Sequence, residues 1–264
     1  MLNYHPRSPW SEEDIQNLVK NSEVYPTYST INHLVNRHSN STEFAIDTED
    51  SILQRLPFAV SKLWESVGLK LDYEYNQDLT LEQLNLVLCY IRKIDPNSFY
   101  QSVEILVKSV HILESKDAFT DVSYTDPDLP FTVFINIPNY KCKNWLERAV
   151  ENIIHETMHL QLSLLEDKYD LYLDSNRKTY SPWKDAFRDS KGLLHALYVF
   201  ANLQHFWQEV YNKRKCSFAA RRIEEIESEK NLIDYELIKS LYTQKGVQLL
   251  GSCLAKNTMF LNLL

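Results

Sequence analysis

Apolar residues recur every three or four positions along most of the chain, which is the spacing of an amphipathic α-helix. This pattern predicts helices over residues 11–20, 51–67, 80–95, 98–114, 144–166, 191–211 and 235–260. Ser11 and Thr80 each stand three positions before a polar residue, the arrangement of a capping box, and are predicted helix starts. Only four glycines occur in 264 residues, so tight β-hairpins are expected to be scarce.

Residues 119–139 break the helical pattern. Two short runs rich in β-branched and aromatic residues lie on either side of a segment with Pro127 and Pro130, and prolines of this kind are typical of turns. These runs predict a small β-sheet directly before the helix of residues 144–166. The predicted fold class is therefore mainly α, of the α+β type, with a small sheet beside that helix.

The chain shows no internal repeat and no Gly/Ser-rich linker. We therefore expect a single domain over residues 1–264, with a helical N-terminal part in 1–115 and the sheet and site helices in 116–264. A net charge of −8 argues against nucleic acid as a partner. No run approaches the roughly 20 apolar residues that span a bilayer, and four scattered cysteines suit a reducing compartment, so we expect no membrane partner and a cytoplasmic protein.

The candidate chemistry begins with "IIHETMHL", residues 153–160. His155 and His159 are four positions apart, so on a helix they share one face and can direct a ring nitrogen each at one metal ion. Glu156 points away from the shared ligand position and can instead reach a group bound to the ion. In the alternative without function, both histidines are core residues bonded to carbonyl groups.

A third ligand has to come from elsewhere in the chain. The HExxHxxGxxH pattern requires glycine at 162 and histidine at 165, where leucines stand. His195 lies in another apolar helical segment and is the preferred candidate. The acidic run Glu224, Glu225, Glu227 and Glu229 remains a second possibility, although its helix is expected to be charged and solvated.

Arg188 precedes His195 by seven residues. If one helix contains both, they share a face about 10 Å apart along the axis. Because a guanidinium binds a carboxylate bidentately, this spacing suggests a small dicarboxylate spanning metal and arginine. A surface arginine paired with Asp185 or Asp189 is the alternative.

Three segments together resemble the HEXXH-motif peptide-modification family of ribosomal peptide pathways: "IIHETMHL", "YSPWKDAFRDSKGLLHALYVFANLQHFW" and "SYTDPDLPFTVFINIP". They cover about the central third of the chain. The resemblance implies an Fe(II)- and 2-oxoglutarate-dependent peptide β-hydroxylase, with dioxygen and a precursor peptide as partners. It makes His155, His159 and His195 the iron ligands and Arg188 a contact for the distal carboxylate of 2-oxoglutarate. Ala196 departs from the family, in which glycine is expected after the third histidine.

Two other functions remain open at this point. In a zinc metallopeptidase, Glu156 would be the general base that activates a zinc-bound water, whereas in the hydroxylase it orients a histidine, water or substrate. A non-catalytic helical protein that binds a peptide is the third possibility. In either peptide-binding case the strand "FTVFINI", residues 131–137, is a candidate sheet edge for the peptide.

Overall fold

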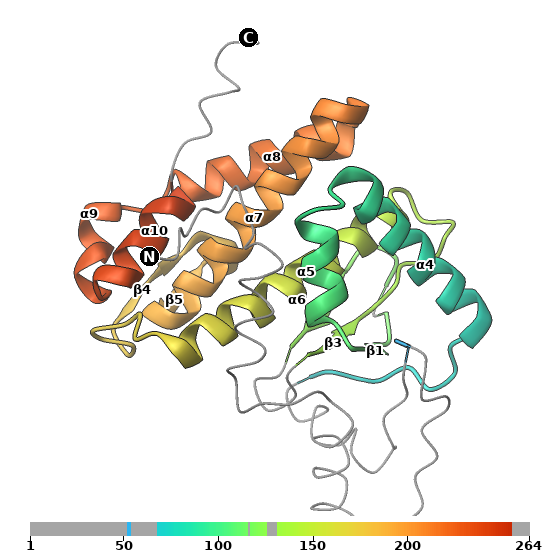
Figure 1. The fold of residues 1–264 in the computed structure, drawn as a ribbon, viewed down its shortest axis with the longest axis horizontal. Coiled ribbons are helices and arrows are strands. Elements are labelled where there is room, and N and C mark those ends of the chain that lie inside the picture. The colour runs from blue at the N-terminus through green and yellow to red at the C-terminus, as the bar shows by residue number, and fades with distance from the viewer. Residues whose placement is uncertain (1–51, 54–67, 116, 126–130, 255–264) are drawn as a thin grey trace, which may run out of the picture. The chain divides into compact units, whose positions relative to one another are not determined.

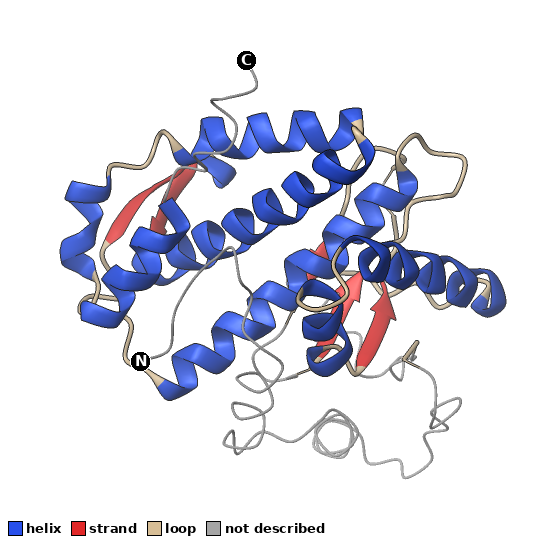
Figure 2. Ribbon diagram, turned by 45° about the horizontal axis from the view of Figure 1, so that its top comes forward, coloured by secondary structure: helices blue, strands red, loops and turns tan. Residues whose placement is uncertain are grey.

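The computed structural model describes residues 52–53, 68–115, 117–125 and 131–254. These residues are mainly helical, with two small sheets, which confirms the predicted fold class (Figure 2). They fall into two compact units that divide after Leu164, within a single helix. We call them the N-terminal unit and the C-terminal unit. The expected subdivision at residue 115 does not coincide with this division, and the predicted helices over 11–20 and 51–67 lie outside the described residues apart from Ile52 and Leu53.

The N-terminal unit combines a three-stranded sheet with helices (Figure 1). Its elements are α4 (Gln77–Ile94), α5 (Phe99–Leu106), β1 (Ser109–Ile112), β2 (Ser123–Tyr124), β3 (Thr132–Ile135) and most of α6 (Trp145–Lys168). All four residues of β1 and of β3 are buried, so both faces of these strands are covered. The expected sheet before the histidine helix is therefore present, and α6 matches the predicted helix closely.

The sheet has the order β1-β3-β2. β1 runs parallel to β3, with Ser109 opposite Thr132, and β2 runs antiparallel to it, with Ser123 opposite Ile135. Because β3 lies between two partners, it is not the sheet edge that the sequence suggested for peptide binding. The outer strands of this sheet are β1 and β2.

The C-terminal unit is built around α7 (Ser190–Arg214), which packs against α8 (Ser217–Lys230), α10 (Gln244–Leu254) and a two-stranded sheet. The sheet strands are β4 (Lys178–Ser181) and β5 (Ala186–Asp189), joined by the 3-10 turn η1 (Pro182–Lys184). Two short elements, α9 (Tyr235–Ile238) and η2 (Lys239–Leu241), precede α10. Phe206 and Trp207 are fully buried, and Trp207 meets Phe218 edge to face with 5.0 Å between ring centroids.

Four helix predictions need correction. α4 begins at Gln77, because Asn76 caps it by accepting from the Leu79 amide at 3.0 Å, and Thr80 lies inside the helix. The segment predicted as a helix over 98–114 divides into α5 and strand β1. Residues 186–189 form β5, so Arg188 is not on the helix of His195. The helix expected over 235–260 is interrupted before α10, and its last six positions are outside the described residues.

Within the described residues, no helix combines the length and the apolar character needed to cross a membrane.

Candidate functional site

His155 and His159 lie next to each other on α6 in the N-terminal unit. Their Nε2 atoms are 3.2 Å apart, and the ring centroids are separated by 4.9 Å. The helix forms because Ile153, Ile154 and Met158 are fully buried on its other faces. This leaves the histidines partly exposed, with 26% of the His155 side chain accessible.

The separation of the two nitrogens tests whether the pair fits a metal ion. Two imidazole nitrogens bound to one ion at about 2.1 Å lie about 3.0 Å apart at right angles and about 3.4 Å apart at the tetrahedral angle. The observed 3.2 Å falls between these values. The same distance suits a hydrogen bond between the rings, with one nitrogen donating. The pair therefore fits a metal ion without requiring one.

Glu156 is almost completely buried beside this pair, with 3% of its side chain exposed. Its Oε1 lies 3.9 Å from Nε2 of His155, beyond hydrogen-bond distance. One turn earlier on α6, the Asn152 amide nitrogen donates to the backbone oxygen of Asn136 at 3.2 Å. Asn136 directly follows β3, so this contact fixes the sheet to the helix turn that precedes the histidines.

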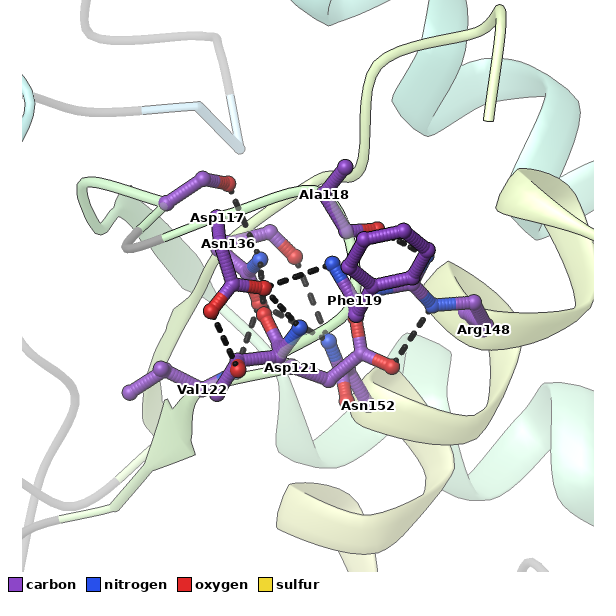
Figure 3. Close-up of polar contacts among 10 residues, drawn as sticks. Asp117, Ala118, Phe119, Asp121, Val122, Asn136, Arg148 and Asn152 are labelled. Atoms are coloured by element: carbon purple, nitrogen blue, oxygen red, sulfur yellow. Dashed lines mark hydrogen bonds and ion pairs between the residues drawn. The ribbon is translucent and has the colours of Figure 1, made fainter. Parts of the chain in front are cut away.

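A polar cluster at the start of α6 holds the loop before β2 (Figure 3). Arg148 forms a bidentate ion pair with Asp121, with both N–O distances at 2.8 Å, and donates to the Ala118 carbonyl at 2.7 Å. Asn136 accepts from the Val122 amide at 2.7 Å and donates to the Thr120 carbonyl at 3.3 Å. Helix α6 is thus fastened to the sheet and to this loop through side chains that the sequence analysis did not identify.

His195 lies on α7 in the C-terminal unit and is bound to a carboxylate. Its Nε2 is 2.8 Å from Oε1 of Glu166, and Lys191 Nζ is 2.9 Å from the other oxygen. Tyr172 donates a short hydrogen bond to the same carboxylate. Burial raises the pKa of Glu166, but the contacts with His195, Tyr172 and Lys191 outweigh it, and the net pKa lies below the usual range. Glu166 is therefore ionised at neutral pH.

Burial, followed by the charge of Glu166 and the hydrogen bond to it, raises the pKa of Tyr172, which stays protonated. Sequence reasoning missed Glu166, Lys191 and Tyr172 altogether. A signal was available for the first of these, since Glu166 stands seven positions after His159 in a predicted helix, and residues seven apart share a helix face. Its contact with His195, 29 residues along the chain, has no signature in the sequence.

Arg188 lies on β5, where it is exposed and directly opposite Thr179 of β4. Within the described residues it forms no ion pair with Asp185 or Asp189, so the surface pairing considered above is not observed. Asp185 accepts instead from the Tyr180 hydroxyl at 2.7 Å, and Asp189 caps α7 by accepting from the Gly192 amide at 2.7 Å. Among the residues that the structure describes, the guanidinium therefore has no carboxylate partner.

Two of the four glutamates considered on α8 have partners within the C-terminal unit. Glu225 pairs with Arg222, and Glu227 accepts from Gln204 at 2.6 Å. No three His, Cys, Asp or Glu side chains within the described ranges form a metal-binding group. The structure supplies one close pair, His155 with His159, and a separate pair, His195 with Glu166, so the third-ligand role of His195 stays a prediction. Neither the protein-family models nor the curated proteins compared with the chain give a match.

Proposed function

We propose that this protein is an Fe(II)- and 2-oxoglutarate-dependent oxygenase that hydroxylates a side-chain β-carbon in a ribosomally made peptide. The observation that carries the proposal is the convergence of His155 and His159, whose Nε2 atoms are separated as two ligands of one ion would be. The iron and its keto-acid co-substrate would supply the oxidising chemistry. His195 is proposed as the third ligand on the strength of the family resemblance.

The residues of the chain have separate roles in this proposal. Arg188, uncommitted among the described residues, binds the distal carboxylate of 2-oxoglutarate through its planar fork. Glu156, buried beside His155, orients the histidine or a water molecule near it. Glu166 holds His195 through the 2.8 Å contact and acts as a positioning residue.

A zinc metallopeptidase is the second candidate, and one observation favours it. A buried glutamate next to the first histidine, 3.9 Å from its Nε2, is suitably placed for a general base acting on a metal-bound water. The same glutamate therefore serves either chemistry. The donor set does not choose between them, because imidazole binds both zinc and iron.

The deciding experiment measures the mass of the peptide product. Short open reading frames beside the gene provide candidate peptides, and each is incubated with the protein under two conditions. With Fe(II), 2-oxoglutarate and dioxygen, we expect an intact peptide heavier by one oxygen atom and an equal amount of succinate. Two peptide fragments formed with zinc and without 2-oxoglutarate would establish the peptidase and overturn the hydroxylase.

A further inference from the structure

The β4–β5 hairpin places three polar side chains on one face. Residues directly opposite each other in an antiparallel pair share a face, as do alternate residues of one strand. Thr179 is opposite Arg188, and Ser181 is two positions along from Thr179, so all three belong to the same face. Tyr180 and Phe187, opposite each other with ring centroids 6.2 Å apart, form the other face, which is exposed.

The polar face carries two hydroxyl groups, those of Thr179 and Ser181. Thr179 Oγ1 and Ser181 Oγ are both buried and make no hydrogen bond within the described part of the chain, and Ser181 is 0% exposed. A third such group follows at the turn, where the Trp183 indole nitrogen is also buried without a partner among the described residues. Its ring stacks flat on Phe200 of α7, with 5.0 Å between ring centroids. Because buried polar groups are normally hydrogen-bonded, three within five residues indicate a missing partner.

Arg188 brings a positive charge to this face. A Cβ atom built on Gly192 would lie 3.1 Å from Arg188 Nε, so the guanidinium rests against the first turn of α7. A side chain at this position would push the guanidinium away, so the glycine lets it lie this close to the helix. The neighbouring carboxylates do not take up the charge, because Asp189 caps the helix and Asp185 is bonded to Tyr180.

The chemistry of these groups determines what the missing partner is. A guanidinium and an indole N–H only donate hydrogen bonds, and the two hydroxyls can donate as well. The occupant must therefore accept hydrogen bonds and carry negative charge. A carboxylate fits one guanidinium in both charge and planar geometry.

We infer that the polar face of the β4–β5 hairpin is a carboxylate-binding site in which Thr179 and Ser181 act together with Arg188. The inference rests on the proposed function for the identity of its ligand, the distal carboxylate of 2-oxoglutarate. It adds that the two hydroxyls, and not the arginine alone, determine the affinity for a dicarboxylic acid.

Thermal unfolding with and without glutarate tests the inference. Glutarate carries two carboxylates of suitable spacing but no keto group, so its binding requires neither metal nor oxidation. The variants are Ser181→Ala and Thr179→Val, each of which removes one hydroxyl, together with Arg188→Met. Phe187→Leu is the matched control, because it changes an exposed side chain on the other face of the same hairpin and leaves the bond between Tyr180 and Asp185 in place.

Each variant has a specific expected result. Glutarate raises the melting temperature of the unaltered protein and of Phe187→Leu equally, and this increase is lost in Arg188→Met. Ser181→Ala and Thr179→Val weaken glutarate binding about tenfold each, because a charge-assisted hydrogen bond is removed. Without glutarate these two variants melt at the same temperature as the unaltered protein or above it, since a buried unpartnered hydroxyl has been removed. If Ser181→Ala does not fold, Thr179→Val alone carries the test.

Three outcomes overturn the inference. The first is glutarate binding that is unchanged in both hydroxyl variants. The second is inorganic phosphate binding more tightly than glutarate, which would change the ligand class. The third is an experimental structure with glutarate present in which ordered water alone occupies both hydroxyls. Failure of the proposed function gives a different result. A protein that binds glutarate at the hairpin but hydroxylates no peptide would support the carboxylate site and contradict only the hydroxylase function.

Discussion

The two histidine environments differ in what holds the ring nitrogens. In the N-terminal unit, His155 and His159 direct their Nε2 atoms at each other across 3.2 Å. In the C-terminal unit, His195 directs its Nε2 at an ionised carboxylate 2.8 Å away, which is itself bonded to Lys191 and Tyr172. The first arrangement resembles two ligands converging on one ion. The second resembles a histidine positioned by a carboxylate, an arrangement common around metal ligands.

Replacing single histidines is the strongest test of whether these two environments differ in their role. We expect His155→Ala and His159→Ala to lose at least about a hundredfold in Fe(II) affinity, because each removes one of the two converging nitrogens. His195→Ala should lose as much if it is the third ligand. Iron content after anaerobic dialysis measures the effect. Full iron occupancy in His195→Ala, together with loss in His159→Ala, would contradict the third-ligand assignment and direct attention to Glu166 or Glu224–Glu229.

Glu166→Gln separates the positioning role from the ligand role. It removes the negative charge that His195, Lys191 and Tyr172 all contact, so we expect the free energy of unfolding to fall by about 2–4 kcal/mol. Iron affinity should fall about 10- to 100-fold, as it does when residues that orient metal ligands are changed. Chemical denaturation and iron titration measure the two effects. Asp167→Asn, an exposed neighbour on α6, is the control and should change neither.

Arg188→Ala tests whether the C-terminal unit binds the co-substrate independently of the metal. The variant should fold normally, retain its iron and lose about 1–3 kcal/mol of 2-oxoglutarate binding free energy, the value of a hydrogen bond to a charged group. Calorimetric titration under nitrogen provides the measurement, with the exposed Arg177→Ala as a matched control. Unchanged affinity in Arg188→Ala would leave the arginine without a role in ligand binding.

Asp121→Asn examines the support of the N-terminal unit. It removes the charge from the bidentate pair with Arg148, whose side chain is only 13% exposed, so we expect a loss of about 1–2 kcal/mol in unfolding free energy. Iron affinity should stay unchanged, because the loop is bonded to Arg148, two helix turns before His155, and to Asn136 beside the sheet. A parallel fall in iron affinity would show that this loop positions the histidine pair after all.

The smallest expected effect concerns acid pH and Asp117. Hydrogen bonds from the Phe119 amide, the Thr120 hydroxyl and the Thr120 amide lower the pKa of this exposed carboxyl. Its contribution to stability is therefore present above the ordinary aspartate pKa and disappears as the pH falls through the lowered folded-state pKa. An NMR titration of the carboxyl carbon should show the depressed midpoint. A midpoint at the ordinary aspartate value would mean that these bonds do not persist in solution.

The local sequence was sufficient to predict an element where its apolar residues follow a single spacing and the adjoining residues fit the same element. The helix with His155 and His159 could be predicted because its apolar residues repeat every three or four positions over six turns, which only a helix can bury. The scarcity of glycine correctly indicated a mainly helical chain, and the β-branched runs located β2 and β3. In each case the free energy depends mainly on residues close together in the chain.

Local sequence failed where a distant partner determined the structure. Leu106, Val110 and Leu113 fit the spacing of a helix. Val110 and Ile112 also fit the alternation of a strand, and pairing with β3 made this segment β1. The β4–β5 hairpin carries mostly polar residues, so its pairing and the face shared by Arg188, Thr179 and Ser181 were not visible beforehand. The contact between Glu166 and His195 was not predicted either, because 29 residues separate them in the sequence.

The sequence by itself therefore determined the mainly helical fold and the pair of histidines on α6, because both follow from side-chain spacing along one helix. Only the tertiary structure decided that Glu166 holds His195 and that Arg188 lies on a strand opposite Thr179. Such contacts depend on where separate elements meet, and that is decided by the packing of the whole unit rather than by the residues that make the contact.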